Sequence, residues 1–292
     1  MAKMEDDLYL QKELRKIEAW EKEQKQVFFW EKLSRLPFML LDKVTPKLIR
    51  DKLGDLLGEM GRFLQTGGQY LVQPESVLKQ LEKQARLQNG GSLPEEGGFN
   101  AQKEELTLEK ARAFPLEIMD RTADELIGGR VKFAAVQGAA TGVGGVFTLA
   151  ADIPMVLGLS LKVLQEIALC YGYDPRTEQE RIFIVKCLQF ASADVVGKKA
   201  VLEELALFER EDKELQVFSQ IQGWREVVQT YRDSFGMKKL FQLIPVAGMV
   251  FGSISNKGTI EDVAEAGKML YRKRRILARL NERNRALDDS DR

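Results

Sequence analysis

The chain has 292 residues, of which 44% are apolar and 30% are charged, with 44 Lys and Arg against 44 Asp and Glu. This size and composition indicate a folded protein of one large domain or two modest ones, and the balanced charge excludes a molecule-wide field for nucleic acid. The absence of histidine excludes Ser-His-Asp and Cys-His catalysis in their usual forms, as well as zinc sites with imidazole ligands.

The cysteines and the N-terminus indicate a cytoplasmic protein. Cys170 and Cys187 lie in apolar stretches of helical pattern, without CxxC spacing, so we expect free and buried thiols. The first residues, MAKMEDDLYLQKELRK, are charged and of helical pattern, unlike a signal peptide. The sequence contains no recognisable motif for a metal ion or a cofactor, and we expect neither.

The N-terminal part of the chain carries amphipathic helices. Between Leu8 and Trp30 apolar residues recur at helical spacing, and the stretch ends in an aromatic cluster that contains Phe28, Phe29 and Trp30. This cluster fits an interfacial membrane anchor and the packing face of a helix equally well. Further helical stretches follow up to residue 87.

A segment of low apolar content separates these helices from the rest of the chain. Its sequence, QNGGSLPEEGGFN at residues 88–100, is rich in Gly, Pro and Glu, as flexible linkers are. We therefore predict an N-terminal amphipathic helical arm over residues 1–87, a flexible linker over 88–106 and a helical core over 107–292.

The core region has the 3.6-residue period of helices and lacks convincing segments with the two-residue period of strands. Thr177 with Glu180 forms a capping-box pattern that starts one helix, and Thr259 with Asp262 forms a similar pattern for the C-terminal helix. The sequence therefore predicts an all-α fold, a multi-helix bundle with glycine-rich, close-packed apolar helices.

One apolar tract marks the core. From Phe133 to Leu161 the only formal charge is Asp152, and this length could cross a bilayer. Small residues recur four apart, which leaves strips where the backbone of another helix can approach closely. A second apolar segment, LFQLIPVAGMVFGSIS at residues 240–255, has the same character. The residues expected to serve packing in the two segments are Gly138, Gly142, Gly144, Gly145, Pro245, Gly248, Gly252 and Asn256.

Asp152 and Pro154 argue against a single helix through the tract, because a central carboxylate is costly in a bilayer and proline breaks helices. We predict two helices, over 132–151 and 154–171, with Asp152 at the junction and Gly172 as the cap of the second helix. The glycines match neither GxxxxGK[ST] nor GxGxxG, so a nucleotide loop is not expected. A packed core is the preferred interpretation, and insertion into a bilayer stays open.

Three motifs, in order along the chain, resemble the EcsC protein family. They are the glycine-rich run followed by DIP at 152–154, YGYD at 171–174, and IPVAGMVFGSISN at 244–256 followed by a helix with MLYRKRRIL. The opening helix with Trp20 is similar as well. The resemblance implies a bacterial protein accessory to membrane transport or secretion, since the family is named for an operon shared with an ABC transporter. It implies no catalytic residues.

The C-terminal helix becomes basic toward its end. Acidic residues lie in its first turns and bases follow, a distribution that the helix dipole favours. With apolar residues opposite, the same bases are also typical of a surface for anionic lipid, and RNA is a weaker alternative. The candidate residues for a membrane or partner surface are Lys268, Arg272, Lys273, Arg274, Arg275 and Arg279, together with Trp20, Phe28, Phe29 and Trp30.

These features favour a non-enzymatic cytoplasmic protein that associates peripherally with the inner membrane or with a membrane protein. Anionic lipid and a membrane protein such as an ABC transporter are the expected partners, whereas nucleic acid is not expected; a small-molecule ligand and the oligomeric state stay open. One alternative is an integral membrane or pore-like helical element. Another is an enzyme that uses Asp152, or Asp174, as an acid or base in an apolar pocket.

Overall fold

The computed structural model describes residues 5–25, 71–88, 106–143, 145–193, 195–208 and 245–290. It describes the side chains of these ranges except those of 142–154, 195–196, 207–208, 245–252, 255 and 289–290. Within the described residues every regular element is an α-helix, so the predicted all-α class is confirmed. The helices are α1 (Asp7–Gln24), α5 (Pro74–Gln88), α6 (Leu108–Ala111), α7 (Leu116–Val143), α8 (Gly145–Cys170), α9 (Glu178–Ser192), α10 (Val195–Phe208) and α12 (Pro245–Ser290).

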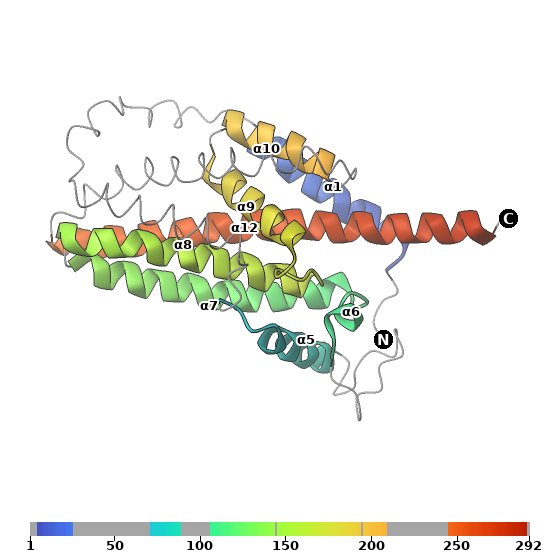
Figure 1. The fold of residues 1–292 in the computed structure, drawn as a ribbon, viewed down its shortest axis with the longest axis horizontal. Coiled ribbons are helices and arrows are strands. Elements are labelled where there is room, and N and C mark those ends of the chain that lie inside the picture. Colours follow the sequence, from blue (N-terminus) through green and yellow to red (C-terminus); the bar gives the residue numbers. More distant parts are fainter. Residues whose placement is uncertain are drawn as a thin grey trace.

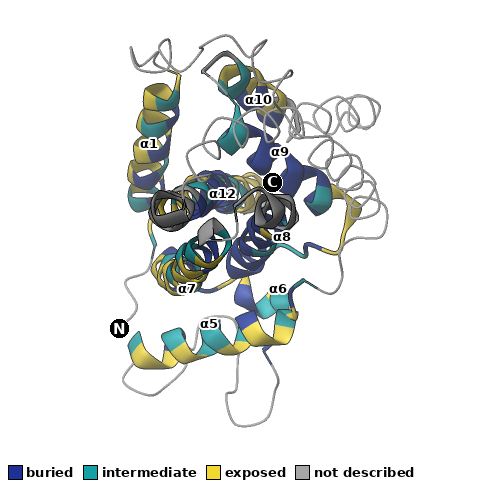
Figure 2. Cartoon of the chain, turned by 90° about the vertical axis from the view of Figure 1, so that its left-hand side faces the viewer, coloured by how far each residue is buried: buried dark blue, intermediate teal, exposed yellow. Residues whose placement is uncertain are grey.

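Three long helices form the centre of the fold. Helices α7, α8 and α12 lie side by side and each contacts the other two (Figure 1). Helices α1, α9 and α10 lie on one side of this layer, where α1 and α9 contact α12, and α5 lies on the other side against α7 and α8 (Figures 1 and 2). The predicted division into an arm, a linker and a core stays a prediction, and most of the linker lies outside the described residues.

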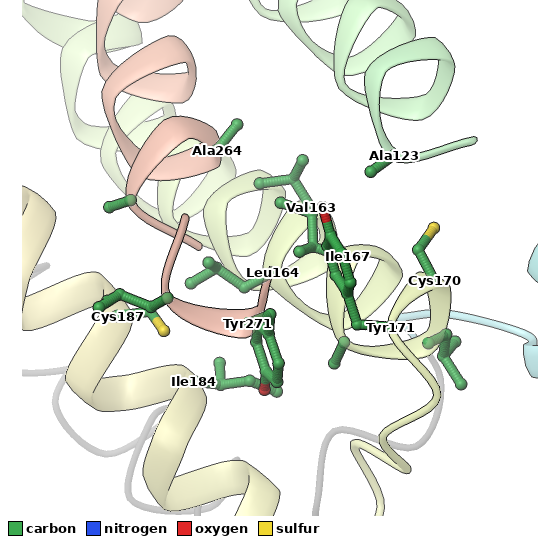
Figure 3. Packing of buried hydrophobic residues seen from close by; sticks show 14 of the residues in the cluster. Ala123, Val163, Leu164, Ile167, Cys170, Tyr171, Ile184, Cys187, Ala264 and Tyr271 are labelled. Carbon is green, nitrogen blue, oxygen red and sulfur yellow. The ribbon is translucent and has the colours of Figure 1, made fainter. Parts of the chain in front are cut away.

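The apolar core is built around the second half of α8. Every residue from Val163 to Gly172 is buried, including the polar Gln165 and Glu166, so this part of the helix is enclosed on all sides. Leu164 and Ile167 of α8 lie near Tyr271 of α12 and Ile184 of α9 (Figure 3).

Both cysteines belong to this core. Cys170 and Cys187 are free and fully buried, as predicted. Burial raises the pKa of both thiols well above the usual value, because a thiolate would lose its hydration there.

Two predicted helix boundaries are wrong. Helix α8 runs without a break through residues 152–154, and the change of helix falls earlier, between the end of α7 at Val143 and the start of α8 at Gly145. The tandem glycines at 144 and 145 are weak helix formers, whereas the burial of α8 offsets the backbone hydrogen bond that Pro154 cannot make. Helix α12 likewise continues through Thr259, because its buried face extends on both sides of that residue.

Gly267 allows α12 to approach α8 closely. A Cβ atom at Gly267 would lie 2.4 Å from Cδ2 of Leu164 and 3.4 Å from Cδ1 of Ile167, and both side chains are fully buried. Close packing by a glycine was predicted for other positions, and at Gly267 the reason is visible: the neighbouring core side chains have little room to move.

We expect Gly267→Val to lower the free energy of unfolding by about 1–3 kcal/mol, because the added atoms collide with the core of α8. Gly258 provides the control on the same helix, since no atom lies within 4 Å of its Cβ position. Gly258→Val should change stability by no more than about 0.5 kcal/mol. Urea unfolding of both variants measures the difference, and equal stabilities would contradict the close approach.

Candidate functional site

The predicted membrane or partner surface on α12 faces other helices in the structure. We call the six bases Lys268, Arg272, Lys273, Arg274, Arg275 and Arg279 the α12 basic face. Each makes a hydrogen bond to a residue outside α12, and in five of them the acceptors include a carboxylate. A role of this face in lipid binding stays a prediction, and its bases are already engaged within the molecule.

Arg272 joins three helices in a buried network. Its Nη2 donates to Glu13 of α1 at 2.8 Å, and its Nε donates to Asp120 of α7 at 2.9–3.0 Å. The hydroxyl of Tyr171 donates to the same Asp120 at 2.6 Å. Only 8% of Arg272 and 7% of Glu13 is exposed, so each charge depends on its partners for solvation.

The pKa values in this network follow from burial and pairing. Burial raises the pKa of the Tyr171 hydroxyl well above its usual value, and the charge of Asp120 raises it further. Burial also opposes ionisation of Glu13, but hydrogen bonds from Lys16 and Arg272 hold the pKa of that carboxyl below its usual value. The network therefore contains ionised Glu13 and neutral Tyr171 near neutral pH.

More contacts attach α1 to α12. Lys273 donates to Glu21 at 2.7 Å, Trp20 Nε1 donates to Glu265 at 2.8 Å, and Arg279 pairs with Glu5. The Trp20 ring also lies 5.4 Å from that of Phe190 in α9. Trp20, a candidate for the membrane or partner surface, is thus part of the contact between helices.

Arg274 forms a second buried pair, with Glu180 at the start of α9. Its Nη1 lies 2.8 Å from Glu180, and its guanidinium stacks over the rings of Tyr173 and Phe183. Burial raises the pKa of Glu180 even with Arg274 beside it. The hydroxyl of Thr177 accepts from the Glu180 backbone at 3.4 Å, so the predicted N-cap is present while the Glu180 carboxylate contacts α12.

The YGYD motif forms the turn after α8. Gly172 has φ +79°, and the bonds Gly172 N–H to Leu169 and Tyr173 N–H to Ala168 close the helix as a Schellman cap. The carboxylate of Asp174 accepts hydrogen bonds from Nε and Nη2 of Arg176, and mainly these bonds hold the pKa of Asp174 below its usual value. The Asp174 carboxylate is therefore engaged in a salt bridge within the turn after α8.

The opposite end of the helical layer exposes apolar side chains. Phe133 and Val136 of α7 are 54% and 70% exposed, Met155 of α8 is 47% exposed, and Ile254 of α12 is 63% exposed. Gly138 and Asn256 are buried nearby in α7 and α12. The remaining candidates lie outside the described side chains, so their roles stay predictions: Phe28, Phe29, Trp30, Gly142, Gly144, Gly145, Asp152, Pro154, Pro245, Gly248 and Gly252.

The acids that accept hydrogen bonds from the arginines were not among the residues predicted from the sequence. On α1 the buried positions are Leu10, Glu13, Ile17 and Glu21. Their spacing of three and four residues places two carboxylates within an apolar stripe, a signal that buried cationic partners exist. The pair of Arg130 with buried Glu166 was missed as well.

The fold and these contacts define a class of protein: a helical protein whose long central helix carries cations that pair inside the molecule. Among the described residues, no three His, Cys, Asp or Glu side chains group as metal ligands would. In the same residues, no helix combines the length and apolar character that a membrane crossing needs.

The chain belongs to the EcsC protein family, which it matches over residues 11–276. It is 56% identical to "Uncharacterized protein YdbA" of Bacillus subtilis (strain 168), over 96% of this chain and 97% of that protein. It is 32% identical to "Protein EcsC" of the same organism, over 54% of this chain and 64% of that protein. No solved structure matches the chain.

We expect Arg272→Glu to lower the free energy of unfolding by about 3–5 kcal/mol, because it leaves buried Glu13 and half-buried Asp120 beside a third carboxylate. Arg285 on the same helix is exposed, so Arg285→Glu is the matched charge reversal and should cost no more than about 0.5 kcal/mol. Thermal and urea unfolding compare the two variants. A stable Arg272→Glu protein would show that the network contributes little to the fold.

Proposed function

We propose that this protein is a non-enzymatic protein that associates peripherally with the inner face of the cell membrane. Four exposed side chains of helices α7, α8 and α12 make the contact. We call them the apolar end: Phe133, Val136, Met155 and Ile254. A role accessory to transport or secretion is part of the proposal and rests on membership of the EcsC family alone.

The observation that carries the proposal is that these side chains lie at similar distances from the ends of their helices. Phe133 lies ten residues before the end of α7, Met155 ten residues after the start of α8, and Ile254 nine residues after the start of α12. At a rise of about 1.5 Å per residue, they lie about 15 Å from the helix ends. These ends meet on the same side of the molecule (Figure 1).

The charges near the apolar end agree with a lipid surface. Exposed Lys132 precedes Phe133 directly, and the side chain of Lys257, three residues after Ile254, is 51% exposed. Basic residues next to exposed apolar residues are typical of the membrane–water interface, where the bases can contact lipid phosphates while the apolar side chains contact the acyl chains. Four large exposed apolar side chains at a similar distance from the ends of adjacent helices are consistent with such a contact.

The α12 basic face supports a lipid contact less well. Arg272 and Arg275 are 8% and 5% exposed, and Arg274 is paired with buried Glu180. To reach lipid phosphates, Arg272 and Arg274 would have to leave the buried carboxylates of Glu13 and Glu180, and each lost pair would leave an uncompensated charge.

We expect the protein to float with vesicles of phosphatidylglycerol and phosphatidylethanolamine, and Phe133→Gln/Val136→Gln to weaken binding at least about tenfold, because two apolar side chains no longer enter the lipid. The matched control is Leu8→Gln/Leu87→Gln, which changes two leucines that are 75% and 67% exposed outside the apolar end. The proposal fails if the unaltered protein stays at the bottom of the gradient, or if both double variants bind equally.

A further inference from the structure

Two arginines approach the turn after α8 from different elements. Arg275 of α12 donates its Nε–H to the carbonyl of Tyr171 at 2.8 Å, and Arg112, after α6, donates its Nε–H to the carbonyl of Gly172 at 2.8 Å. A Cβ atom at Gly172 would lie 2.5 Å from Cγ of Arg112 and 3.0 Å from Nη2 of Arg275. Because both distances start from one point, these two atoms are at most 5.5 Å apart.

Gly172 makes this approach possible. Its φ of +79° suits glycine, and a side chain there would collide with the stem of Arg112. The two arginines therefore reach adjacent carbonyl groups over the same residue, although the chain separates them by more than 160 positions.

Arg275 is a buried cation that forms no salt bridge with a carboxylate among the described residues. Its neighbours on α12 pair with carboxylates: Arg272 with Glu13 and Asp120, Arg274 with Glu180, and Arg279 with Glu5. Only 5% of Arg275 is exposed, and its described contacts are the Tyr171 carbonyl and the face of the Tyr173 ring. Burial lowers the pKa of Arg275, and the charges of Arg279 and Arg112 lower it further, whereas Tyr173 and the charge of Glu282 act in the opposite direction.

Capping of α8 explains only part of this arrangement. Cations near a helix C-terminus bind the last carbonyl groups, and the two Nε–H bonds do so here. Each guanidinium keeps its terminal N–H groups, and no described residue accepts from those of Arg112 or Arg275. The nearby carboxylate of Asp174 is taken by the side chain and backbone N–H of Arg176.

We propose that Arg112 and Arg275 bind a tetrahedral oxyanion beside Gly172: inorganic phosphate or the phosphoryl group of a phosphate monoester. Two planar guanidinium groups, each fixed by its Nε, present N–H donors that match phosphate oxygens, and the anion supplies the charge that Arg275 lacks. The proposal is independent of the proposed function. Met155, the residue of the apolar end on α8, lies 17 residues before Gly172, or about 25 Å at the helical rise, so the site is apart from the proposed lipid contact and the ligand comes from solution.

Calorimetric titration of the full chain with inorganic phosphate tests the site, with sodium chloride at matched ionic strength as the reference. A parallel titration with glycerol 3-phosphate separates the two sources: tighter binding than phosphate assigns a monoester, and equal or weaker binding assigns the free anion. Bound phosphate should also raise the unfolding temperature in a saturable way.

We expect Arg112→Gln to raise the dissociation constant for phosphate at least about tenfold, because charge-assisted hydrogen bonds are lost. Arg112 is exposed, so this variant should fold. Arg121→Gln, on exposed Arg121 of α7 whose partner is Glu117, should bind as the unaltered protein does. Arg275→Lys, which keeps the charge and loses the planar group, should weaken binding as well.

The inference is overturned if phosphate has no more effect than chloride at equal ionic strength. It is also overturned if Arg112→Gln binds as tightly as Arg121→Gln does. Failure of vesicle flotation would leave this result unaffected, because the two experiments probe separate sites.

Discussion

The guanidinium of Arg272 lies where three helices meet, and the arrangement of the described helices depends on it. It bonds Glu13 of α1 and Asp120 of α7, while Tyr171 at the end of α8 donates to the same Asp120. A buried cation is tolerated only when its hydrogen bonds are met, so this contact fixes the position of α1 on α12 and the rotation of α12 about its axis. The same rotation directs Arg275 to the turn after α8.

Apolar packing stabilises the helix arrangement that the ion pairs select. Helix α8 is enclosed from Val163 to Gly172, and Gly267 brings α12 close enough to fill the space beside Leu164. The two types of contact support each other. Burial excludes water from the pairs and strengthens them, and the pairs select one register among the ways in which apolar helices could slide.

The central layer differs strongly between its two ends. Around the turn after α8, charged groups of α1, α7, α9 and α12 are tied into pairs. At the other end, Phe133, Val136 and Ile254 are exposed. A protein with this distribution can meet an apolar surface at one end and a soluble anion at the other without either contact disturbing its core. The apolar end and the arginine pair at Gly172 are accordingly proposed as separate sites.

The sequence by itself determined what depends on neighbouring residues: the all-α class, the N-cap at Thr177, the cap at Gly172 and the free thiols. It also contained the motifs of the family. Only the tertiary structure decided that α8 passes through Pro154 and α12 through Thr259, because burial against distant helices outweighs a local break signal. Lys268, Arg272, Arg275 and Arg279 share one helix face by their spacing, but spacing alone does not say which way a face points. Their direction was set by acids far away in the sequence, such as Glu13 and Asp120, which become neighbours only when the chain folds.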